Sequence, residues 1–544
     1  GADGGWKTTN PYSDNNWNKD TEPKTYTNNM ILSSNKTDGN YGTNLSYGLR
    51  LSGELTDVNF VNNGSIIGIM RDTSSSSSGY GIYNSAKMSN IENTGVISGS
   101  GIYNGNAASY GYGIYNNSSA EIKDITNTGT ISGFADDVND SGSTASGHGI
   151  YNDSGAEIQN IKNTGLISGY GTGRRGSNGY GIYNNPRAEI KDITNIGAII
   201  NIGVISGYGD DTTSSIGSGN GYGIYNNGIY NNELAKIGNI TNTGVISGYG
   251  SGTGSASSSG IYSVNNDFST TSDGEIENIT NTGIISGSGV GIYNAKSGSK
   301  YKMEIGDITN TGVIYGKDNA IKNNSGTIGT VDNYGILATQ GDSVIKGTIG
   351  TEKNYGLYIG KDGKITVGTE KLSDDSIKVV VGYTEDGKEI VKDMTIKNAT
   401  LNGDSGSATS TVSFVLEGES GEYDNSILNG KDETLKVSGT GNQITDSIIN
   451  AYGTAVVMNE NMSTLILDNT IVNGGISKDD GTVSPVNIAG NGNTLTIQGN
   501  SIINGGDTVI TVSGEKNALV LEGNVKINGE MKSTGTNNLI SLNG

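Results

Sequence analysis

The sequence predicts an all-β fold: a right-handed parallel β-helix with three short strands in each rung, where a rung is one full turn of the coil. Three observations lead to this prediction. A motif with a period in the thirties recurs along the chain, which is typical of stacked repeat architectures. The 88 glycines, 32% hydrophobic residues and 6% aromatic residues leave too little bulk for several compact globular cores. With 4 prolines and 16% charged residues, the chain also lacks the composition of a disordered polypeptide.

Residues 1–40 lack the repeat and contain both tryptophans, Trp6 and Trp17, together with Pro11 and Pro23. The first rung of a β-helix exposes its core unless something covers it. We therefore predict that residues 1–40 form an N-terminal cap. We also expect a mature or trimmed sequence, because no basic and apolar leader opens it.

Residues 41–363 carry the regular repeat, which has three β-patterned pieces: G-I-Y-N, A-E-I-x-x-I-T-N and G-V-I-S-G. Glycine, asparagine or serine separates the pieces, and these residues favour turns. Alternation along the strand places Ile114 and Asn116 inside and Tyr115 outside. Stacking would then form an inner isoleucine ladder, an asparagine ladder at a corner and an outer tyrosine column.

The repeats differ in length mainly between I-S-G and the next G-I-Y. The separating segments include residues 134–146, 170–178, 208–220 and 249–259. We expect these insertions to stack along a single edge of the rod, where sequence variation is tolerated and binding sites commonly arise.

In residues 364–544 the G-I-Y-N motif is absent, but alternating apolar residues and N-G corners persist, as in S-T-L-I-L-D-N-T-I-V-N-G from Ser463. We expect this part to continue the same helix with less regular rungs. The whole chain would then be a rod of about 20 rungs, roughly 100 Å long at about 4.8 Å per rung.

Charge and composition exclude several kinds of partner. A net charge of −21 repels nucleic acid and acidic lipid headgroups. Zero cysteines exclude disulfides and cysteine-ligated metals. No run approaches the roughly 18 to 20 apolar residues of a membrane helix, so we expect no membrane insertion by this segment. No cofactor and no metal site is expected.

The arrays of I-x-N-T-G-x-I-S-G and G-I-Y-N across residues 41–544 resemble the passenger regions of monomeric (type Va) bacterial autotransporters. The resemblance implies a secreted, surface-exposed β-helix at the outer membrane that often mediates adhesion, aggregation or toxicity. It also implies a C-terminal membrane barrel for export, which we expect outside this sequence.

A protease is one alternative, because Gly403-Asp404-Ser405-Gly406-Ser407 resembles the nucleophile motif of the serine-protease autotransporters. A serine protease also needs a histidine as general base. The only histidine, His148, takes a slot held by tyrosine in sibling repeats. We therefore interpret Ser405 as a turn residue and predict no catalytic residue.

The acidic residues suggest two further site chemistries. Paired carboxylates that could cleave polysaccharides are present at Glu121/Asp124, Glu189/Asp192 and Glu275, but they recur at one repeat position, as a solvated face does. Acidic groups Asp136/Asp137/Asp140 and Asp210/Asp211 could bind calcium, yet they match no calcium-binding loop pattern.

The outer tyrosines are the predicted ligand-binding residues, because aromatic rings can stack on sugars or anchor protein partners. Packing between rungs is the structural alternative for the same column. The candidates are Tyr83, Tyr115, Tyr151, Tyr183, Tyr225, Tyr262 and Tyr293.

These observations favour a virulence-associated, non-catalytic adhesin of the bacterial cell surface, binding a host-cell glycan or protein receptor. One alternative is a self-associating rod that drives aggregation or biofilm formation. A second, of another class, is a β-helical polysaccharide-cleaving enzyme or toxin. Binding to cells and glycans would favour the adhesin, and concentration-dependent pairing in solution would favour the self-associating rod.

Overall fold

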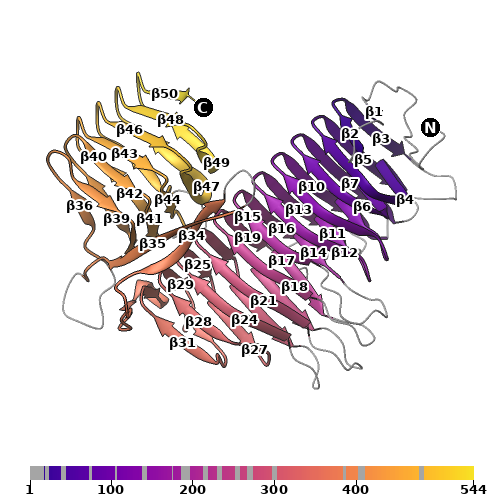
Figure 1. The fold of residues 1–544 in the computed structure, drawn as a ribbon, viewed down its shortest axis with the longest axis horizontal. Coiled ribbons are helices and arrows are strands. Elements are labelled where there is room, and N and C mark those ends of the chain that lie inside the picture. The colour runs from indigo at the N-terminus through magenta and orange to yellow at the C-terminus, as the bar shows by residue number, and fades with distance from the viewer. Residues whose placement is uncertain are drawn as a thin grey trace.

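The computed structural model is built almost entirely of β-strands (Figure 1). The residues that it describes are 17–18, 24–37, 45–72, 76–103, 107–137, 144–173, 176–185, 196–211, 219–228, 236–251, 258–265, 274–296, 303–383, 388–401, 411–476 and 483–543. Within them, no helix is long and apolar enough to cross a membrane.

The predicted parallel β-helix with three strands per rung is confirmed, and the three repeat pieces each form one strand of a rung. We call them the GIYN, ITN and ISG strands. The GIYN strands are the first parts of β4 (Leu45–Asn62) and β6 (Ser77–Asn93), then β8 (Ser109–Asn116), β11 (Ala145–Asn152), β14 (Ser177–Asn184), β17 (Gly219–Gly228), β20 (Ser259–Asn265), β23 (Val290–Lys296), β26 (Asn319–Asn324) and β30 (Ile345–Lys346).

The other two strands of each rung follow at the next two corners. The ITN strands are β2 (Lys24–Asn28), the second parts of β4 and β6, β9 (Glu121–Asn127), β12 (Glu157–Asn163), β15 (Ile196–Asn201), β18 (Lys236–Asn242), β21 (Gly274–Asn281), β24 (Met303–Asn310), β27 (Thr327–Ile328), β28 (Thr330–Asn333) and β31 (Thr351–Asn354). The ISG strands are β3 (Ile31–Thr37), β5 (Ser65–Asp72), β7 (Val96–Tyr103), β10 (Thr130–Asp137), β13 (Leu166–Gly173), β16 (Val204–Asp211), β19 (Val245–Ser251), β22 (Ile284–Gly287), β25 (Val313–Gly316), β29 (Ile336–Thr339) and β32 (Leu357–Ile359).

The inside of this first β-helix has the predicted ladders. Ile82, Ile114 and Ile150 stack in register and are fully buried, and each such isoleucine contributes about 1.5 to 3 kcal/mol through its burial. The ITN asparagines form a chain of side-chain hydrogen bonds, in which each Nδ2 donates to Oδ1 of the next rung. The Asn163–Asn201 bond of 2.9 Å is one example. Amide ladders satisfy buried polar groups that would otherwise destabilise the core.

Glycine lets the GIYN and ISG strands approach each other closely along one side of the first β-helix. We call this side, where Gly99, Gly111 and Gly133 lie, the flange. A Cβ on Gly133 would lie 1.9 Å from the carbonyl oxygen of His148 and 2.4 Å from that of Gly111. A Cβ on Gly99 would meet the carbonyl oxygen of Tyr112 at 1.9 Å. The backbones therefore pack directly against each other, which explains much of the high glycine content.

The chain reverses direction after the first β-helix. Asp362 and Gly363 have φ of 57° and 73°, in a one-turn 3-10 helix, η1 (Lys361–Gly363). The next strand, β33 (Ile365–Val367), is antiparallel to β32 and ends that sheet. An antiparallel hairpin of β34 (Ile377–Tyr383) and β35 (Glu389–Asn398) then leads into a second stack of rungs.

This second β-helix also has three strands per rung and runs back beside the first (Figure 1). Its IxN strands, named for their Ile-x-Asn sequence, are the end of β35, β38 (Ser426–Gly430), β41 (Ile448–Ala451), β44 (Ile471–Asn473) and the first parts of β47 (Ile502–Val512) and β49 (Lys526–Ser533). The others are β36 (Phe414–Leu416), β39 (Glu433–Val437), β42 (Thr454–Met458), β45 (Val486–Ile488) and the second parts of β47 and β49, then β37 (Glu422–Asp424), β40 (Asn442–Thr445), β43 (Thr464–Asp468), β46 (Thr494–Gln498), β48 (Ala518–Glu522) and β50 (Leu539–Asn543).

Hydrogen bonds join the two β-helices rung by rung. Each IxN asparagine donates from Nδ2 to the backbone carbonyl oxygen in the middle of an N-x-G turn on the first β-helix, at 2.8 to 3.0 Å. The six pairs, in order, are Asn398–Tyr355, Asn429–Tyr334, Asn450–Thr311, Asn473–Thr282, Asn504–Thr243 and Asn528–Ile202. Because one partner rises in sequence as the other falls, the two β-helices are antiparallel in chain direction.

Apolar side chains fill the rest of this junction. The residue after each covered N-x-G turn, such as Val313, points away from the first core and belongs to a hydrophobic cluster that includes Tyr452 and Leu401 of the second β-helix. The isoleucines of the IxN strands, such as Ile448, are buried beside the hairpin residues Val379 and Met394. The junction is therefore a second hydrophobic core, and the two β-helices form one unit.

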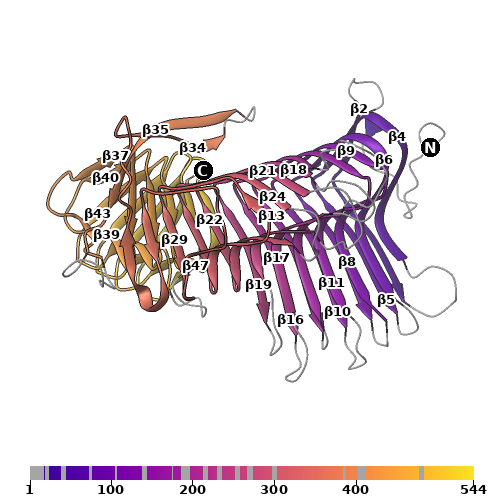
Figure 2. The ribbon, with the colours of Figure 1, turned by 90° about the horizontal axis from the view of Figure 1, so that it is seen from below.

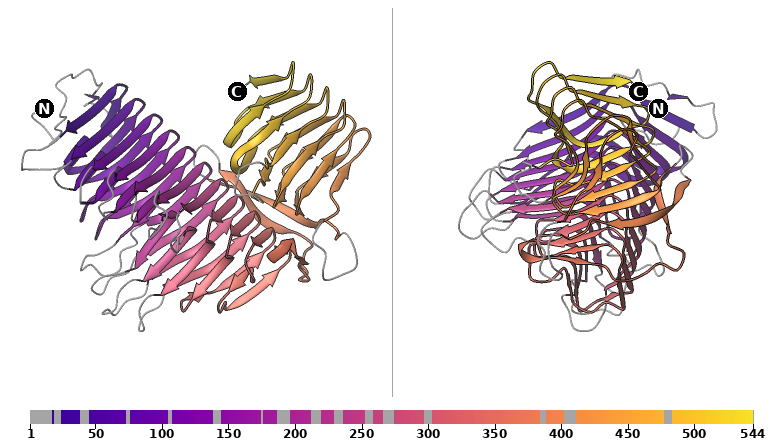
Figure 3. Two further views of the ribbon diagram at one scale, coloured as in Figure 1. Left: turned by 180° about the vertical axis from the view of Figure 1, so that it is seen from behind. Right: turned by 90° about the vertical axis from the view of Figure 1, so that its left-hand side faces the viewer.

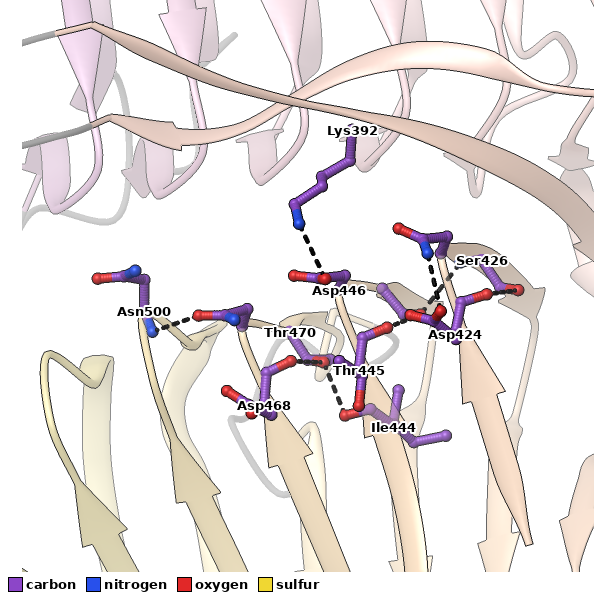
Figure 4. Close-up of polar contacts among 12 residues, drawn as sticks. Lys392, Asp424, Ser426, Ile444, Thr445, Asp446, Asp468, Thr470 and Asn500 are labelled. Atoms are coloured by element: carbon purple, nitrogen blue, oxygen red, sulfur yellow. Dashed lines mark hydrogen bonds and ion pairs between the residues drawn. The ribbon is translucent and has the colours of Figure 1, made fainter.

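The hairpin also makes a polar contact with the second β-helix (Figure 4). Lys392 Nζ of β35 lies 2.9 Å from Oδ2 of Asp446. Asp446 is at the corner between β40 and β41 and has φ of 47°, and Asn425 and Asn469 occupy the same corner with φ of 45° and 47°. Asparagine and aspartate adopt this left-handed conformation more readily than most residues.

The structure differs from the prediction for residues 364–544, which do not continue the first coil. The N-G corners persist because both coils place asparagine at their corners. The chain changes direction at the short η1 turn. The described residues therefore form about 50 Å of coil with eleven rungs and a shorter coil of six rungs beside it, at about 4.8 Å per rung, and the predicted 100 Å rod is wrong.

The predicted N-terminal boundary is also displaced. Residues 24–37 of the predicted cap already form strands β2 and β3, which pair in parallel with β4 and β5. β1 (Trp17–Asn18) pairs antiparallel with β2. Trp6, Pro11 and Pro23 lie outside the described residues.

Candidate binding surfaces

The seven predicted tyrosines form one continuous column on the outside of the GIYN strands. Most rings in adjacent rungs are stacked: Tyr83 and Tyr115 have centroids 5.3 Å apart and planes at 7°, and Tyr115 and Tyr151 are 5.1 Å apart at 5°. The stack continues through Tyr183, Tyr225 and Tyr262, and the column ends at Tyr293, which meets Tyr262 edge-on at 67°. The predicted outward direction of these side chains is confirmed.

A second aromatic column stands beside the first. It includes Tyr80, Tyr112 and Tyr180, each three residues before a tyrosine of the first column. Tyr180 meets Tyr183 edge-on at 4.9 Å and 90°. Burial raises the pKa of Tyr180 well above its ordinary value, so its hydroxyl stays protonated at physiological pH.

Cations cover both ends of the predicted tyrosine column. The Arg50 guanidinium lies 5.6 Å from the ring centroid of Tyr83, and Lys322 Nζ lies 4.7 Å from that of Tyr293. Between these ends the rings from Tyr83 to Tyr262 stack on one another, and Tyr262 meets Tyr293 edge-on. Tyr115 also donates a 2.5 Å hydrogen bond to Asp153. The ring faces that would stack on a sugar are therefore occupied by protein, and their role in binding stays a prediction.

His148 occupies the tyrosine slot of the second column, as its repeat position predicts. It pairs in register with Tyr112 and Tyr180 and stacks between their rings at 5.0 and 4.7 Å. Burial lowers its pKa from 6.5 to about 3, which leaves the imidazole neutral. Ser405 lies outside the described residues, so its relation to His148 is not placed.

A third aromatic column, which the repeat motifs did not reveal, lies on the outer face of the flange. Phe134, Tyr170, Tyr208 and Tyr249 stack at 5.5, 5.0 and 5.0 Å with planes within 12°. Each follows I-S-G directly, which was the signal available in the sequence. The structure shows that the ISG strands extend through these positions, which we expected to begin the insertions.

This flange column is open at one end. The ISG strand after Tyr249 is β22, which ends at Gly287, the partner of Gly248, and the next residue along is a serine. Tyr249 is 42% exposed. Ser251 donates a hydrogen bond to Asp210 two residues further along the strands, on the same outer face. An exposed aromatic ring therefore lies beside hydroxyl and carboxylate groups.

The insertions lie where the sequence predicts, between ISG and GIYN strands. The connecting segments are residues 138–144, 174–176, 212–218 and 252–258. The connections between GIYN and ITN strands also vary in length, from residues 117–120 to residues 185–195. Along the chain, the predicted insertions therefore follow directly after the ISG strands that carry the flange column.

The carboxylates considered for catalysis belong to charged columns. Glu121 pairs in register with Lys87 and Glu157, and Asp124 accepts a hydrogen bond from Asn160. Lys236 Nζ lies 3.4 Å from Glu275 and 2.6 Å from Glu277. Glu189 and Asp192 lie outside the described residues.

The acidic groups considered for calcium are separated by strand geometry. Asp136 points outward and Asp137 inward on β10, and burial raises the pKa of Asp136, with a further contribution from Asp137. Asp210 and Asp211 alternate in the same way on β16, and Asp140 lies outside the described residues. Among described residues no group of three or more His, Asp or Glu side chains could hold a metal ion.

A shallow groove on the second β-helix is lined in part by Asp432, Glu433 and Lys436. Lys436 Nζ lies 2.7 Å from Glu433, and Lys431 Nζ lies 2.9 Å from Asp432. These charged groups are paired with one another, so the groove offers a ligand fewer unpaired charges. It is therefore a weaker candidate binding site than the flange.

No family model matches the chain, and no significant match was found among curated proteins or solved structures.

Proposed function

We propose that this chain is the surface-exposed passenger of a bacterial autotransporter and acts as a non-catalytic adhesin that binds a host-cell glycan or protein. The observation that carries the proposal is the open end of the flange column, where Tyr249 presents an exposed ring beside Asp210 and Ser251. Aromatic faces bordered by hydrogen-bonding groups suit both sugar rings and protein anchors. The segments that follow the ISG strands along the chain differ in length and sequence among the repeats, as the loops of binding proteins commonly do.

Export through a C-terminal membrane barrel and display outside the outer membrane belong to the same proposal. The parallel β-helix and the absence of cysteine support it, because a chain that folds by stacking rungs needs no disulfide exchange in an oxidising compartment.

The test is binding of the full chain to an array of glycans and to cultured host cells, beside Tyr249→Ala. Loss of one aromatic contact, about 0.5 to 1.5 kcal/mol, would weaken saturable binding up to about tenfold. Tyr249→Phe keeps the ring face and is expected to bind like the parent chain. Tyr293→Ala is the matched control, because that ring is covered by Lys322.

The outcomes separate the alternatives. Binding that survives Tyr249→Ala but is lost in Tyr293→Ala would move the site to the predicted tyrosine column. No binding, together with concentration-dependent dimers in sedimentation, would replace adhesion by self-association.

A further inference from the structure

The first β-helix extends well past the end of its junction with the second (Figure 3, left). The second β-helix covers six N-x-G turns, from Tyr355 down to Ile202. Five more turns continue the same row, and no described asparagine of the second β-helix reaches them. Their middle residues are Asn29, Asn63, Thr94, Thr128 and Thr164.

Four of the uncovered turns, those centred on Asn63, Thr94, Thr128 and Thr164, are N-x-G turns with the same backbone hydrogen bonds as the covered ones, whereas Met30 follows Asn29 in the first. In the covered turn at Thr282, the amides of Thr282 and Gly283 donate to the carbonyl oxygen of Asn242 at 2.8 and 3.1 Å. In the uncovered turn at Thr128, the amides of Thr128 and Gly129 donate to Asn93 at 2.8 and 3.0 Å. The middle carbonyl oxygens therefore project from equivalent positions in both parts, and no described residue donates to those of the uncovered turns.

The apolar row beside the turns also continues without a break. Strand pairing aligns Ile31, Ser65, Val96, Thr130 and Leu166 with Val204, Val245, Ile284, Val313, Ile336 and Leu357. Val313 is fully buried under the second β-helix, whereas Ile31, Val96 and Leu166 are 67%, 37% and 36% exposed. Aliphatic side chains thus occupy every second uncovered rung, in a row that elsewhere serves as a hydrophobic core.

We propose that the five uncovered turns are a docking surface for the β-helix of a separate polypeptide. The partner is defined by the chemistry of the covered turns: corners spaced about 4.8 Å apart, each presenting an asparagine amide to a turn carbonyl, with apolar side chains beside it. The site is continuous with an interface already built for that occupant, since Asn528 reaches Ile202 and the next turn in the row is Thr164. Amide donors on the partner match the turn carbonyl oxygens of this row, whereas two copies of the row would bring carbonyl oxygens against carbonyl oxygens.

A deletion tests whether the uncovered turns accept this chemistry. Removing residues 245–283 takes out one complete repeat and joins Gly244 to Ile284. The deletion removes the covered turn at Thr282, so the six IxN asparagines would have only five of their original turns left. If the sixth pair still forms, Asn528 would face Thr164, and the second β-helix would cover Leu166. Removing residues 284–312 shifts the register by the same amount and serves if the first deletion fails to fold.

The measurement exploits the cysteine-free sequence. Leu166→Cys is introduced into the parent and deleted chains, and its thiol-labelling rate is compared. We expect labelling at least tenfold slower in the deleted chain. Val96→Cys, uncovered in both chains, is the control and is expected to label equally. If the Leu166→Cys thiol labels as fast in the folded deleted chain as in the parent, the proposal is overturned.

Docking of a separate chain is tested by adding a second protein, the Val313→Asp variant of this chain, as the probe. The buried charge is expected to release its second β-helix, whose IxN corners then become available. Adding this chain to the Leu166→Cys parent is expected to slow labelling in a saturable manner, and a probe that also carries Asn450→Ser and Asn473→Ser is expected not to. Labelling unaffected by the probe would contradict the proposal. Labelling that slows with the concentration of the parent alone would instead identify the occupant as a second copy.

Discussion

At the scale of single residues, His148 shows how the position of a residue in the repeat determines its protonation state. The imidazole is stacked between Tyr112 and Tyr180, and burial lowers its pKa to about 3. The ring is therefore neutral in the folded chain, whereas the unfolded chain binds a proton below pH 6.5. Stability from this residue is present above pH 6.5 and is lost as the pH falls toward 3.

His148→Tyr should remove this pH dependence, because a tyrosine in this slot does not titrate in the acid range. Between pH 7 and pH 4.5 we expect the parent chain to lose about 2 kcal/mol more stability than the variant. Urea unfolding of the two chains at both pH values, followed by tyrosine fluorescence, measures the difference. Equal losses would mean that His148 is solvated.

The sequence predicted which side chains of a strand point inward, because alternation and the G-I-Y-N spacing determine them. It did not predict how the tyrosine rings cover one another. That depends on the 4.8 to 5.3 Å stacking of rungs and on Arg50 and Lys322 at the column ends, which become neighbours only after the coil forms. The candidate site therefore moved from that column to Tyr249.

At the scale of elements, the flange depends on glycine at positions where two strands touch through their backbones. Gly133→Ala would place a Cβ 1.9 Å from the His148 carbonyl oxygen, and neither backbone can move without breaking the pairing of β10 or β11. Overpacking of this kind destabilises by about 1 to 3 kcal/mol or more.

We expect Gly133→Ala to lower the thermal midpoint and to increase hydrogen exchange in β10 and β11. Gly360→Ala is the matched control: Gly360 has φ of −97°, and its Cβ would have 3.8 Å to the nearest atom. A midpoint for Gly133→Ala equal to that of Gly360→Ala would show that the strands separate easily.

The three-strand rung could be predicted because each strand repeats a recognisable motif. The lengths of the ISG strands could not, since Phe134 to Asp137 vary among repeats and resemble the start of an insertion. Their strand conformation comes from pairing with the rungs on either side.

At the scale of the whole molecule, the junction between the two β-helices determines the shape (Figures 2 and 3). Val313→Asp would bury a carboxylate between them, which is unfavourable by several kcal/mol unless the helices separate. We expect the maximum dimension in small-angle X-ray scattering to increase while the far-ultraviolet circular dichroism stays unchanged.

Val96→Asp is the control for this experiment, because Val96 occupies the same repeat position on an uncovered rung. It should leave the scattering profile unchanged. Identical profiles for the two variants would mean that the junction is held elsewhere, for example by the hairpin and the Lys392–Asp446 pair.

The reversal of the chain was beyond prediction from the sequence for a physical reason. Both coils bury aliphatic residues inside and place asparagine at their corners, so the local pattern is the same whether the second coil continues the first or lies beside it. The outward isoleucines of the IxN strands, such as Ile427 and Ile448, were the available sign that a second surface is buried.

The antiparallel junction also determines how the molecule would respond to a pulling force. The two coils are joined by the chain only at the Asn398 end, so a load that draws the free ends apart falls first on the Asn528–Ile202 contact and then on each of the others in turn. Contacts broken one after another yield at lower force than six broken together. Under tension the molecule would therefore lengthen by peeling, with both coils still folded, and would close again when the load is removed.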